Sequence, residues 1–399
     1  MRLAVYHNLP SGGAKKFLWG FVDRARHRHD VDLYRLDDFD NESFCDLRSL
    51  VANDFRYHAG VRPRSISASY RPLQIWTKLA HTERVIAADI DSRNYDAVLV
   101  NHCQHTTSPF LLRRLRTRSL YYMQEPRRHH YEYARMPAMP LNVRQPIGTV
   151  RTLRRMAILA STKARDAASV RAATEVLCNS QYSLESIARA YGRYPTVSYL
   201  GVDDTEYVPG PPSVPRQGLL AVGALHPSKG QLLIVDAVGL LLPSRRPVVD
   251  LVFDREEPDY RQAVEKRAAE AGVAVRFHHR IDEAALIGRY QSAIATVCTS
   301  ELEPFGLTPL ESIACGTPVV AVREAGFRES VVDGVNGYLV DRAPEAVSEA
   351  IDKIAGGGLV ATPDTLRSSL LPKFSLDAAV DRLEQHLVRM AAGDGGSHR

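Results

Sequence analysis

The stretch SELEPFGLTPLESIACGTPVV carries two carboxylates that could do chemistry, Glu303 and Glu311, set eight positions apart. Thr308 followed by Pro309 predicts the start of a helix, with Thr308 as its N-cap and Glu311 closing a capping box. That pattern accounts for Glu311. It leaves Glu303 and the preceding turn at Gly306 unexplained, so we ask what ligand would need acids on both sides of such a turn.

A helix that begins at this turn offers a binding site for an anion. Amides of the first helical turn have no partner inside the helix, and the helix dipole favours negative charge there, so a diphosphate fits. Glu311 could then bond its own cap or accept hydrogen bonds from vicinal hydroxyls such as those of a ribose. Glu303, one loop earlier, would face the hydroxyls of a second polyol. The stretch therefore predicts a site for a sugar carried on a nucleoside diphosphate.

Two other glycine-containing loops also have features of an anion-binding site. LPSGGAKK places Gly12 and Gly13 between the first strand and the first helix, where bare amides can approach an anion. AVGALHPSKGQLL ends a strand at Gly223 and places Lys229 at the start of the next helix, where its ammonium could neutralise a phosphate. A tight turn and a surface lysine are the alternatives. Neither loop is GxGxxG, so the nicotinamide-binding fingerprint is absent.

These residues must be positioned by two α/β halves. We expect strands in the first half at residues 2–7, 31–36, 95–100, 119–123 and 175–179, with helices at 14–28, 73–90 and 181–191. In the second half, we expect strands at residues 218–224, 248–254, 273–277, 295–299 and 318–322. Of the helices expected there, one begins at about residue 229, one ends at 271, one runs through 289 and one spans 373–390. Strands that alternate with helices indicate a doubly wound parallel sheet in each half.

A proline-rich stretch, EYVPGPPSVPRQ, separates the halves and is typical of a stiff linker. The expected organisation is a first domain over residues 1–206, a linker over 207–217 and a second domain over 218–374. An amphipathic helix over 375–392 and a disordered tail over 393–399 complete the chain. Two Rossmann-like sheets joined by a hinge would face a cleft between their carboxyl ends, where ligands of such sheets bind.

Bulk composition points to a cytoplasmic protein. Of the 399 residues, 45% are hydrophobic and 24% charged, with a mean hydropathy of -0.22. No run approaches the roughly 18–20 apolar residues that span a bilayer, and the first apolar run is too short for a signal peptide. Five cysteines without CxxC spacing predict reduced, buried thiols.

Positive charge is concentrated in one segment. The formal net charge is +5, yet the residues from Arg113 to Arg155 include eleven arginines and two acids, a local +9. Such a segment would attract phosphates, anionic lipid or nucleic acid, and solvated helix faces explain it equally well. Nucleic acid is the weaker partner, because the segment holds no recognisable nucleic-acid-binding motif.

The stretch ELEPFGLTPLESIACGTPVVAVREAGFRESVVDGVNGYLV resembles the E-x7-E region of family 4 retaining glycosyltransferases with the GT-B fold. The resemblance covers nearly the whole chain, through PSGGAKK, VLCNSQYSLESIARAYG, VSYLGVDDTEYVP, VGALHPSKG and FSLDAAVDRLEQHL in this order. It implies transfer of a sugar, with retained configuration, from a UDP- or GDP-sugar to a hydroxyl of a saccharide, lipid-linked or small-molecule acceptor. No metal or cofactor is implied, and the last helix would cross back to the first domain.

The resemblance assigns roles residue by residue. Lys229 and Glu303 would be catalytic, the lysine neutralising the departing diphosphate and the glutamate holding the sugar. The donor-binding set that it implies is Gly12, Gly13, Gly223, Lys229, Glu303, Phe305, Gly306, Leu307, Thr308 and Glu311. Glu311 would bind the ribose, and the amides of Gly306, Leu307 and Thr308 the diphosphate.

Two departures from the family pattern bear on activity. Ala224 stands where members commonly carry an arginine, and Gln124 stands where many carry a histidine. The acceptor-side candidates are His102, Gln124, Glu125 and Arg127. A catalytically silent nucleotide-sugar-binding protein is therefore the main alternative, and an epimerase or phosphorylase a further one. Peripheral contact of the basic segment with the inner face of an anionic membrane is compatible with the enzyme.

Overall fold

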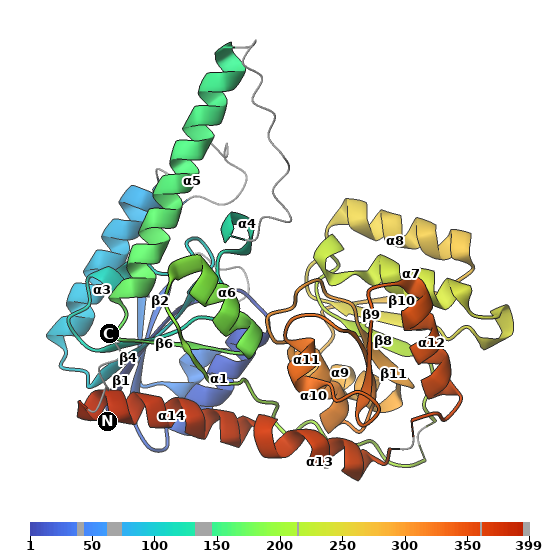
Figure 1. Ribbon diagram of the computed structural model, residues 1–399. Helices are drawn as coiled ribbons and strands as arrows, with labels where there is room; N and C mark the ends of the chain where they lie inside the picture. Colours follow the sequence, from blue (N-terminus) through green and yellow to red (C-terminus); the bar gives the residue numbers. More distant parts are fainter. Residues whose placement is uncertain (38–43, 62–73, 132–145, 214, 360, 394–399) are drawn as a thin grey trace. The chain divides into compact units, whose positions relative to one another are not determined.

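The computed structural model describes residues 1–37, 44–61, 74–131, 146–213, 215–359 and 361–393. The chain forms two compact units (Figure 1). The first unit comprises Met1–Ser198 together with Val380–Arg399, and the second comprises Tyr199–Ala379. Each unit encloses its own hydrophobic core around a parallel sheet.

The first unit contains a seven-stranded parallel sheet with the order β3-β2-β1-β4-β5-β6-β7. Its strands are β1 (Arg2–Asn8), β2 (Asp30–Leu36), β3 (Asn53–Tyr57), β4 (Ala97–Cys103), β5 (Ser119–Tyr122), β6 (Glu175–Cys178) and β7 (Thr196–Val197). The α-helices are α1 (Gly13–Ala25), α3 (Ala80–Ser92), α4 (Arg128–Tyr131), α5 (Pro146–Ala172) and α6 (Gln181–Tyr191). Short helical turns are η1 (Leu47–Leu50), the π-helical η2 (Ile75–Leu79) and the 3₁₀ turn η3 (Phe110–Arg113). Central strands are buried along nearly their whole length, as parallel sheets covered on both faces require.

The second unit contains a six-stranded parallel sheet with the order β10-β9-β8-β11-β12-β13. Its strands are β8 (Leu219–Val222), β9 (Val249–Phe253), β10 (Val275–His279), β11 (Ala295–Cys298), β12 (Val319–Val322) and β13 (Gly337–Val340). The α-helices are α7 (Gln231–Leu240), α8 (Pro258–Ala271), α9 (Glu283–Ser292), α10 (Leu307–Ala314), α11 (Phe327–Ser330), α12 (Pro344–Ala355) and α13 (Pro363–Phe374). Two 3₁₀ turns, η5 (Pro227–Lys229) and η6 (Pro243–Arg245), lie in the loops. Both sheets have the winding order of a Rossmann fold.

The predicted pattern of alternating strands and helices is confirmed in both units. Helix α6 has the predicted bounds, whereas α1 ends at Ala25, three residues earlier than predicted. The single helix predicted over residues 73–90 is a π-helical stretch followed by α3. Strand β3 and the long helix α5 were not predicted. Strand β3 is short and half-exposed at the sheet edge, so it lacks a continuous apolar run.

The last helix, α14 (Leu376–Ala392), returns the chain to the first unit as predicted (Figure 1). Two side chains on the α1–β2 turn bind it, because His29 Nε2 and Arg28 Nη2 lie 2.6 and 2.7 Å from the carboxylate of Glu384. His386, also on α14, lies 2.6 Å from Glu175 at the start of β6. The tail beyond residue 393 lies outside the described residues.

The proline-rich stretch is bonded to the second unit. Gln217 donates its amide to the Ser292 carbonyl at 2.7 Å, and the guanidinium of Arg216 donates to the Gly316 carbonyl at 2.7 Å. Gln291 in turn donates to the carbonyl of Val208 at 2.9 Å. The stretch is therefore part of the second unit's surface on both sides of residue 214.

All five cysteines are free thiols. Four are buried, and Cys45 is partly exposed. Among the described residues, no helix combines the length and the apolar character that crossing a membrane requires.

Candidate functional site

The strand order of the second unit creates a crevice at one point. β8 lies beside β11, although two strands separate them in the chain, and the connections run in opposite directions from this pair. Ligands of doubly wound sheets bind at the carboxyl ends of such strands. Gly223 follows β8 and Thr299 follows β11, so the loops beginning there meet at this crevice.

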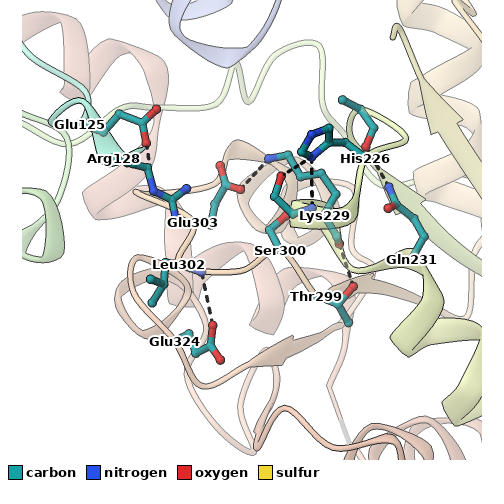
Figure 2. Close-up of polar contacts among 12 residues, drawn as sticks. Glu125, Arg128, His226, Lys229, Gln231, Thr299, Ser300, Leu302, Glu303 and Glu324 are labelled. Atoms are coloured by element: carbon teal, nitrogen blue, oxygen red, sulfur yellow. Dashed lines mark hydrogen bonds and ion pairs between the residues drawn. The ribbon is translucent and has the colours of Figure 1, made fainter. Parts of the chain in front are cut away.

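Lys229 and Glu303 come together at the crevice from these two loops. Lys229 Nζ lies 2.6 Å from Glu303 Oε2, and the two side chains are 30% and 21% exposed. Figure 2 shows the two side chains pointing toward one another. Lys229 lies in the 3₁₀ turn η5, and α7 begins two residues later at Gln231 rather than at the lysine. The pair places one ammonium and one carboxylate within reach of the same bound molecule.

Gly230 allows the two loops to approach closely. Its φ is 73°, and a Cβ at this position would lie 2.4 Å from the carbonyl oxygen of Thr299. The Thr299 hydroxyl donates to the carbonyls of Lys229 and Gly230, both at 3.0 Å. No side chain larger than hydrogen fits here, and the close contact fixes the main chain that carries Lys229.

A second contact fixes the loop that carries Glu303. The guanidinium of Arg342 donates to the carbonyls of Thr299 and Ser300, both at 2.9 Å, and to Glu324 at 2.7 Å. Glu324 also accepts the amide of Leu302 at 3.3 Å, as Figure 2 shows. Arg342 was not predicted, because it lies in the loop after β13, far along the chain from the residues that it holds.

Helix α10 begins at this crevice, and its predicted cap is wrong. Gly306 is the N-cap with a φ of 86°, so Leu307 is the first helical residue and Thr308 the second. A Cβ on Gly306 would lie 2.7 Å from the ring of Phe327, and glycine takes this positive φ at little cost. The turn therefore enters the helix two residues earlier than the Thr-Pro pattern predicts. Of the three amides predicted to bind an anion, that of Gly306 belongs to the N-cap, and those of Leu307 and Thr308 lie in the first turn of α10.

Glu311 does not close a capping box. Its carboxylate is buried and accepts the hydroxyl of Tyr290 at 2.7 Å. Burial, and then the charge of Glu311, raise the pKa of Tyr290 well above its usual value, so this phenol remains a donor. Tyr290, on α9, orients the carboxylate and was not predicted, because a single tyrosine within a helix carries no sequence signal.

Other predicted residues beside the crevice have structural contacts of their own. Phe305 is buried among aromatic rings, 5.8 Å from Tyr199 and 5.7 Å from Phe374 between ring centroids, so only its main chain is available to a ligand. His226 caps η5 by accepting the amide of Ser228 at 3.1 Å. The carbonyl of Ala224 accepts from Gln231 at 3.0 Å.

In the first unit, Gly12 and Gly13 lie at the N-terminus of α1. Gly12 is the N-cap with a φ of 142°, and its carbonyl accepts the amides of Lys15 and Lys16, each at 3.1 Å. A Cβ there would meet nothing within 4 Å, so the backbone conformation, not crowding, favours glycine. Gly13 is the first residue of the helix.

The four acceptor-side candidates lie at the carboxyl ends of two neighbouring strands of the first unit. His102 lies near the end of β4, and Gln124, Glu125 and Arg127 follow β5. Gln124 accepts from the Asn179 amide at 2.9 Å, and Arg127 donates to the His105 carbonyl at 2.7 Å.

His102 and Glu125 differ in their electrostatic surroundings. Burial, and then the positive charge of Arg127, lower the pKa of His102 to about 4, so the imidazole is neutral near pH 7. Its Nδ1 atom is buried and has no partner within the described part of the chain. Glu125 forms an ion pair with Arg128 at 3.8 Å.

A metal site is not apparent from side-chain placement. Over the described ranges, no three histidine, cysteine or acidic side chains are grouped so that they could hold an ion. Part of the basic segment from Arg113 to Arg155, residues 132–145, lies outside those ranges.

Comparisons with known proteins bear on the family and the fold. Residues 213–358 match the family Glycosyl transferases group 1. A D-inositol 3-phosphate glycosyltransferase of Frankia alni is 36% identical over 176 residues, covering 39% of this chain and 42% of its own. The enzyme of the same name from Acidothermus cellulolyticus is 34% identical over 215 residues, covering 48% of this chain and 47% of its own. The chain thus spans less than half the length of these relatives.

Solved structures match over almost the entire chain. Anabaena HepE in complex with UDP and glucose has a TM-score of 0.72 at 18% identity, covering 97% of this chain and 99% of its own. Sucrose-phosphate synthase from Thermosynechococcus elongatus has a TM-score of 0.74 at 18% identity, covering 98% and 99%. At this identity the likeness shows the fold, which is that of GT-B glycosyltransferases with two parallel-sheet α/β domains.

Proposed function

We propose that this chain, whose residues 213–358 belong to Glycosyl transferases group 1, is a retaining glycosyltransferase that uses a nucleoside-diphosphate sugar. The observation that carries the proposal is the meeting of Lys229 and Glu303 at the switch point of the second sheet, beside the N-terminus of α10. An ammonium and free helix amides suit a diphosphate, and a carboxylate suits sugar hydroxyls.

The Lys229–Glu303 ion pair suggests how the donor enters. Binding of a diphosphate gives the ammonium a new anionic partner, and the carboxylate of Glu303 then turns to the hydroxyls of the transferred sugar. Glu311, held by Tyr290, accepts from the ribose hydroxyls. Gly223 and the amides of Leu307 and Thr308 lie against the phosphates.

In the reaction, the bond between the anomeric carbon and the diphosphate oxygen breaks as the acceptor hydroxyl attacks from the same face. The departing diphosphate oxygen takes the proton of that hydroxyl, so the products are the glycoside and the protonated nucleoside diphosphate. Lys229 and the helix amides stabilise the negative charge that develops on the leaving group, which is the largest contribution asked of the protein.

Lys229 and the N-terminus of α10 supply the positive charge that stabilises the leaving diphosphate, so we propose that the transfer needs neither a metal ion nor a cofactor. Turnover is expected to be unchanged when a chelator such as EDTA is added. Loss of turnover with EDTA, restored by a divalent cation, would contradict this part of the proposal.

One screen can identify the nucleotide of the donor and reduce the number of candidate acceptors. HepE was solved with UDP, which makes UDP-sugars the first donors to test, with GDP-sugars next. The relatives are named for D-inositol 3-phosphate, which makes a phosphorylated polyol an acceptor to include beside saccharides and lipid-linked saccharides. Thermal shift identifies the nucleotide, because specific binding raises the melting temperature by mass action. Mass spectrometry with the selected donor then detects the glycoside.

A silent nucleotide-sugar-binding protein is the second candidate, favoured by Ala224 and Gln124. The side chain of Gln124 is already bonded to Asn179, and no guanidinium stands at position 224. A clear thermal shift without transfer or hydrolysis across the donor panel would support this candidate over the enzyme.

We also propose a cytoplasmic location with peripheral contact at an anionic membrane. The basic segment supports it, and so do two exposed apolar side chains on α5, Leu153 at 58% and Met156 at 55% exposure. Pelleting with anionic vesicles at low salt, lost at high salt, is the expected result. Equal pelleting with neutral vesicles, or none, would contradict it.

A further inference from the structure

A pocket in the first unit gathers positive charge at a place that the proposed transfer reaction does not use. It has a volume of 280 Å³ and lies where η2, the start of α3, η3 and α5 pack together. That volume is just below the range of about 300–1,000 Å³ for small-molecule sites. Its charged and aromatic lining is Trp76, His81, Arg84, Phe110, Arg113, Arg114 and Arg165.

Among the residues that the structure describes, no acid lines this pocket. Arg84, Arg113 and Arg114 are exposed, and Arg165 is half-buried. Over the described residues, no carboxylate lies within ion-pair distance of any of the four guanidinium groups. Some surface arginines of this unit do have a carboxylate partner, as Arg93 has Asp89 at 3.1 Å. Four unneutralised guanidinium groups around one hollow repel one another, so an anion there would relieve the repulsion.

Two acids adjoin lining residues along the chain, Glu83 beside Arg84 and Asp166 beside Arg165, and both are buried. Asp166 accepts the hydroxyl of Tyr191 at 2.7 Å. Glu83 precedes Arg84 on α3, but its carboxylate is fully buried and accepts the Tyr6 hydroxyl at 2.7 Å. It also accepts the amides of Phe110 and Leu111, the latter at 3.2 Å. Glu83 therefore fixes η3 against the core, and with it the position of Arg113, while leaving the pocket positive.

Two of the lining side chains are held in place before any ligand binds. Arg165 lies over the ring of Trp76, with its Cζ 5.2 Å from the ring centroid, and its Nε contacts the Ser161 hydroxyl at 3.5 Å. Arg84 Nη2 lies 3.4 Å from His81 Nδ1 on the next turn of the same helix. Stacking and hydrogen bonding orient the planar guanidinium forks, which match the oxygens of a phosphate group.

We propose that this pocket binds the phosphate group of a phosphate ester, independently of the donor site in the second unit. The ligand that fits this lining is a phosphate group, held by several guanidinium groups beside an aromatic ring. The ester has two possible sources, a soluble phosphorylated molecule or the headgroup of an anionic phospholipid, and the experiment separates them.

The first arm uses inorganic phosphate as the probe, measured by isothermal titration in the Lys229→Ala background so that the second unit's candidate site is weakened. Arg113→Glu/Arg114→Glu is expected to weaken phosphate binding at least about tenfold, because charge-assisted hydrogen bonds are lost and two acids are introduced. The matched control is Arg171→Glu/Arg189→Glu, which makes the same charge change at exposed helix positions of this unit outside the pocket. The control should bind phosphate as before.

The second arm measures sedimentation with vesicles of phosphatidylcholine alone and with added phosphatidylglycerol. Pocket-dependent binding of free phosphate without vesicle pelleting supports a soluble ester, and pocket-dependent pelleting with phosphatidylglycerol supports a lipid headgroup. The proposal is overturned if neither probe binds, or if the pocket variant and the control behave alike in both arms. Melting temperatures equal to that of the parent chain establish that the variants fold. If Arg113→Glu/Arg114→Glu does not fold, the milder change Arg84→Gln replaces it.

Discussion

At the residue scale, the proposed transfer depends on Lys229, because its ammonium is the one charged side chain assigned to the leaving group, beside the amides of α10. Family members commonly place an arginine at the position of Ala224, and His226 is engaged as the cap of η5. Lys229 instead has Glu303 as its partner at 2.6 Å, which orients the ammonium toward the crevice. An ion pair between two partly exposed side chains is weak enough for a diphosphate to displace the carboxylate.

Lys229→Ala is expected to lower kcat by about 10²–10³-fold, the typical cost of removing one group that stabilises transition-state charge. Lys353→Ala is the matched control, since that lysine is exposed on α12 and pairs with Glu349 on the same helix. The two variants are compared by their steady-state rates with the donor that the screen identifies. Equal kcat in both variants would remove Lys229 from the catalytic group.

His102 provides a test of the acceptor side. Burial and Arg127 lower its pKa to about 4, so NMR of the ring should show a midpoint near pH 4 and no titration between pH 6 and 8. Because the folded pKa lies below the unfolded value of about 6.5, the contribution of His102 to stability is present in full above pH 6.5. It is lost as the pH falls from there toward 4. The free energy of unfolding of His102→Gln should depend less on pH across this window, and a midpoint near 6.5 would refute the burial argument.

At the element scale, the site depends on how closely the β8 and β11 loops approach. Gly230 and Gly334 have nearly the same φ, 73° and 74°, but a Cβ on Gly230 would meet the Thr299 carbonyl at 2.4 Å and one on Gly334 would meet nothing within 4 Å. Alanine at Gly334 therefore measures the free energy lost through backbone conformation alone, and alanine at Gly230 adds the loss through steric crowding.

Gly334→Ala is expected to cost about 1 kcal/mol of stability from its positive φ alone. Gly230→Ala should cost about 2 kcal/mol more from overpacking, and it should also weaken nucleotide binding because the main chain of Lys229 moves. Denaturant unfolding and calorimetric titration with the nucleotide measure the two effects. Similar losses of stability with unchanged affinity would show that this approach does not position Lys229.

The sequence predicted the elements and the neighbourhood of the site better than its local geometry. Alternating strands and helices define both sheets, and the crevice then follows from the strand order. The predicted start of α10 was wrong, because Gly306 takes a positive φ and is the N-cap, two residues before the predicted cap at Thr308. The partners Tyr290 and Arg342 could not be predicted, since their roles depend on contacts between elements distant in the sequence.

At the scale of the whole molecule, the chain leaves the first unit at Ser198 and returns to it at Val380. The return depends on α14 being bonded to the first unit. Glu384 is the central contact, because its nearly buried carboxylate lies 2.6 Å from His29 Nε2 and 2.7 Å from Arg28 Nη2. Asp381, one turn earlier, is 57% exposed and lies 3.4 Å from Arg28.

Glu384→Ala is expected to destabilise the first unit by about 2 kcal/mol, because it removes the carboxylate that contacts the nearly buried ring of His29 and the guanidinium of Arg28. Asp381→Ala should cost less than about 0.5 kcal/mol, since its ion pair is exposed. Thermal unfolding of the full chain compares them. Equal shifts in melting temperature for both variants would mean that this contact does not fasten the returning helix.

The measurement that tests the central claim most directly is a crystal structure with the nucleoside diphosphate selected by the thermal-shift screen. The account predicts a diphosphate at the start of α10, within hydrogen-bond distance of Lys229 Nζ and of the amides of Leu307 and Thr308, with the ribose against Glu311. A nucleotide bound elsewhere on the chain, with the Lys229–Glu303 ion pair intact, would contradict it.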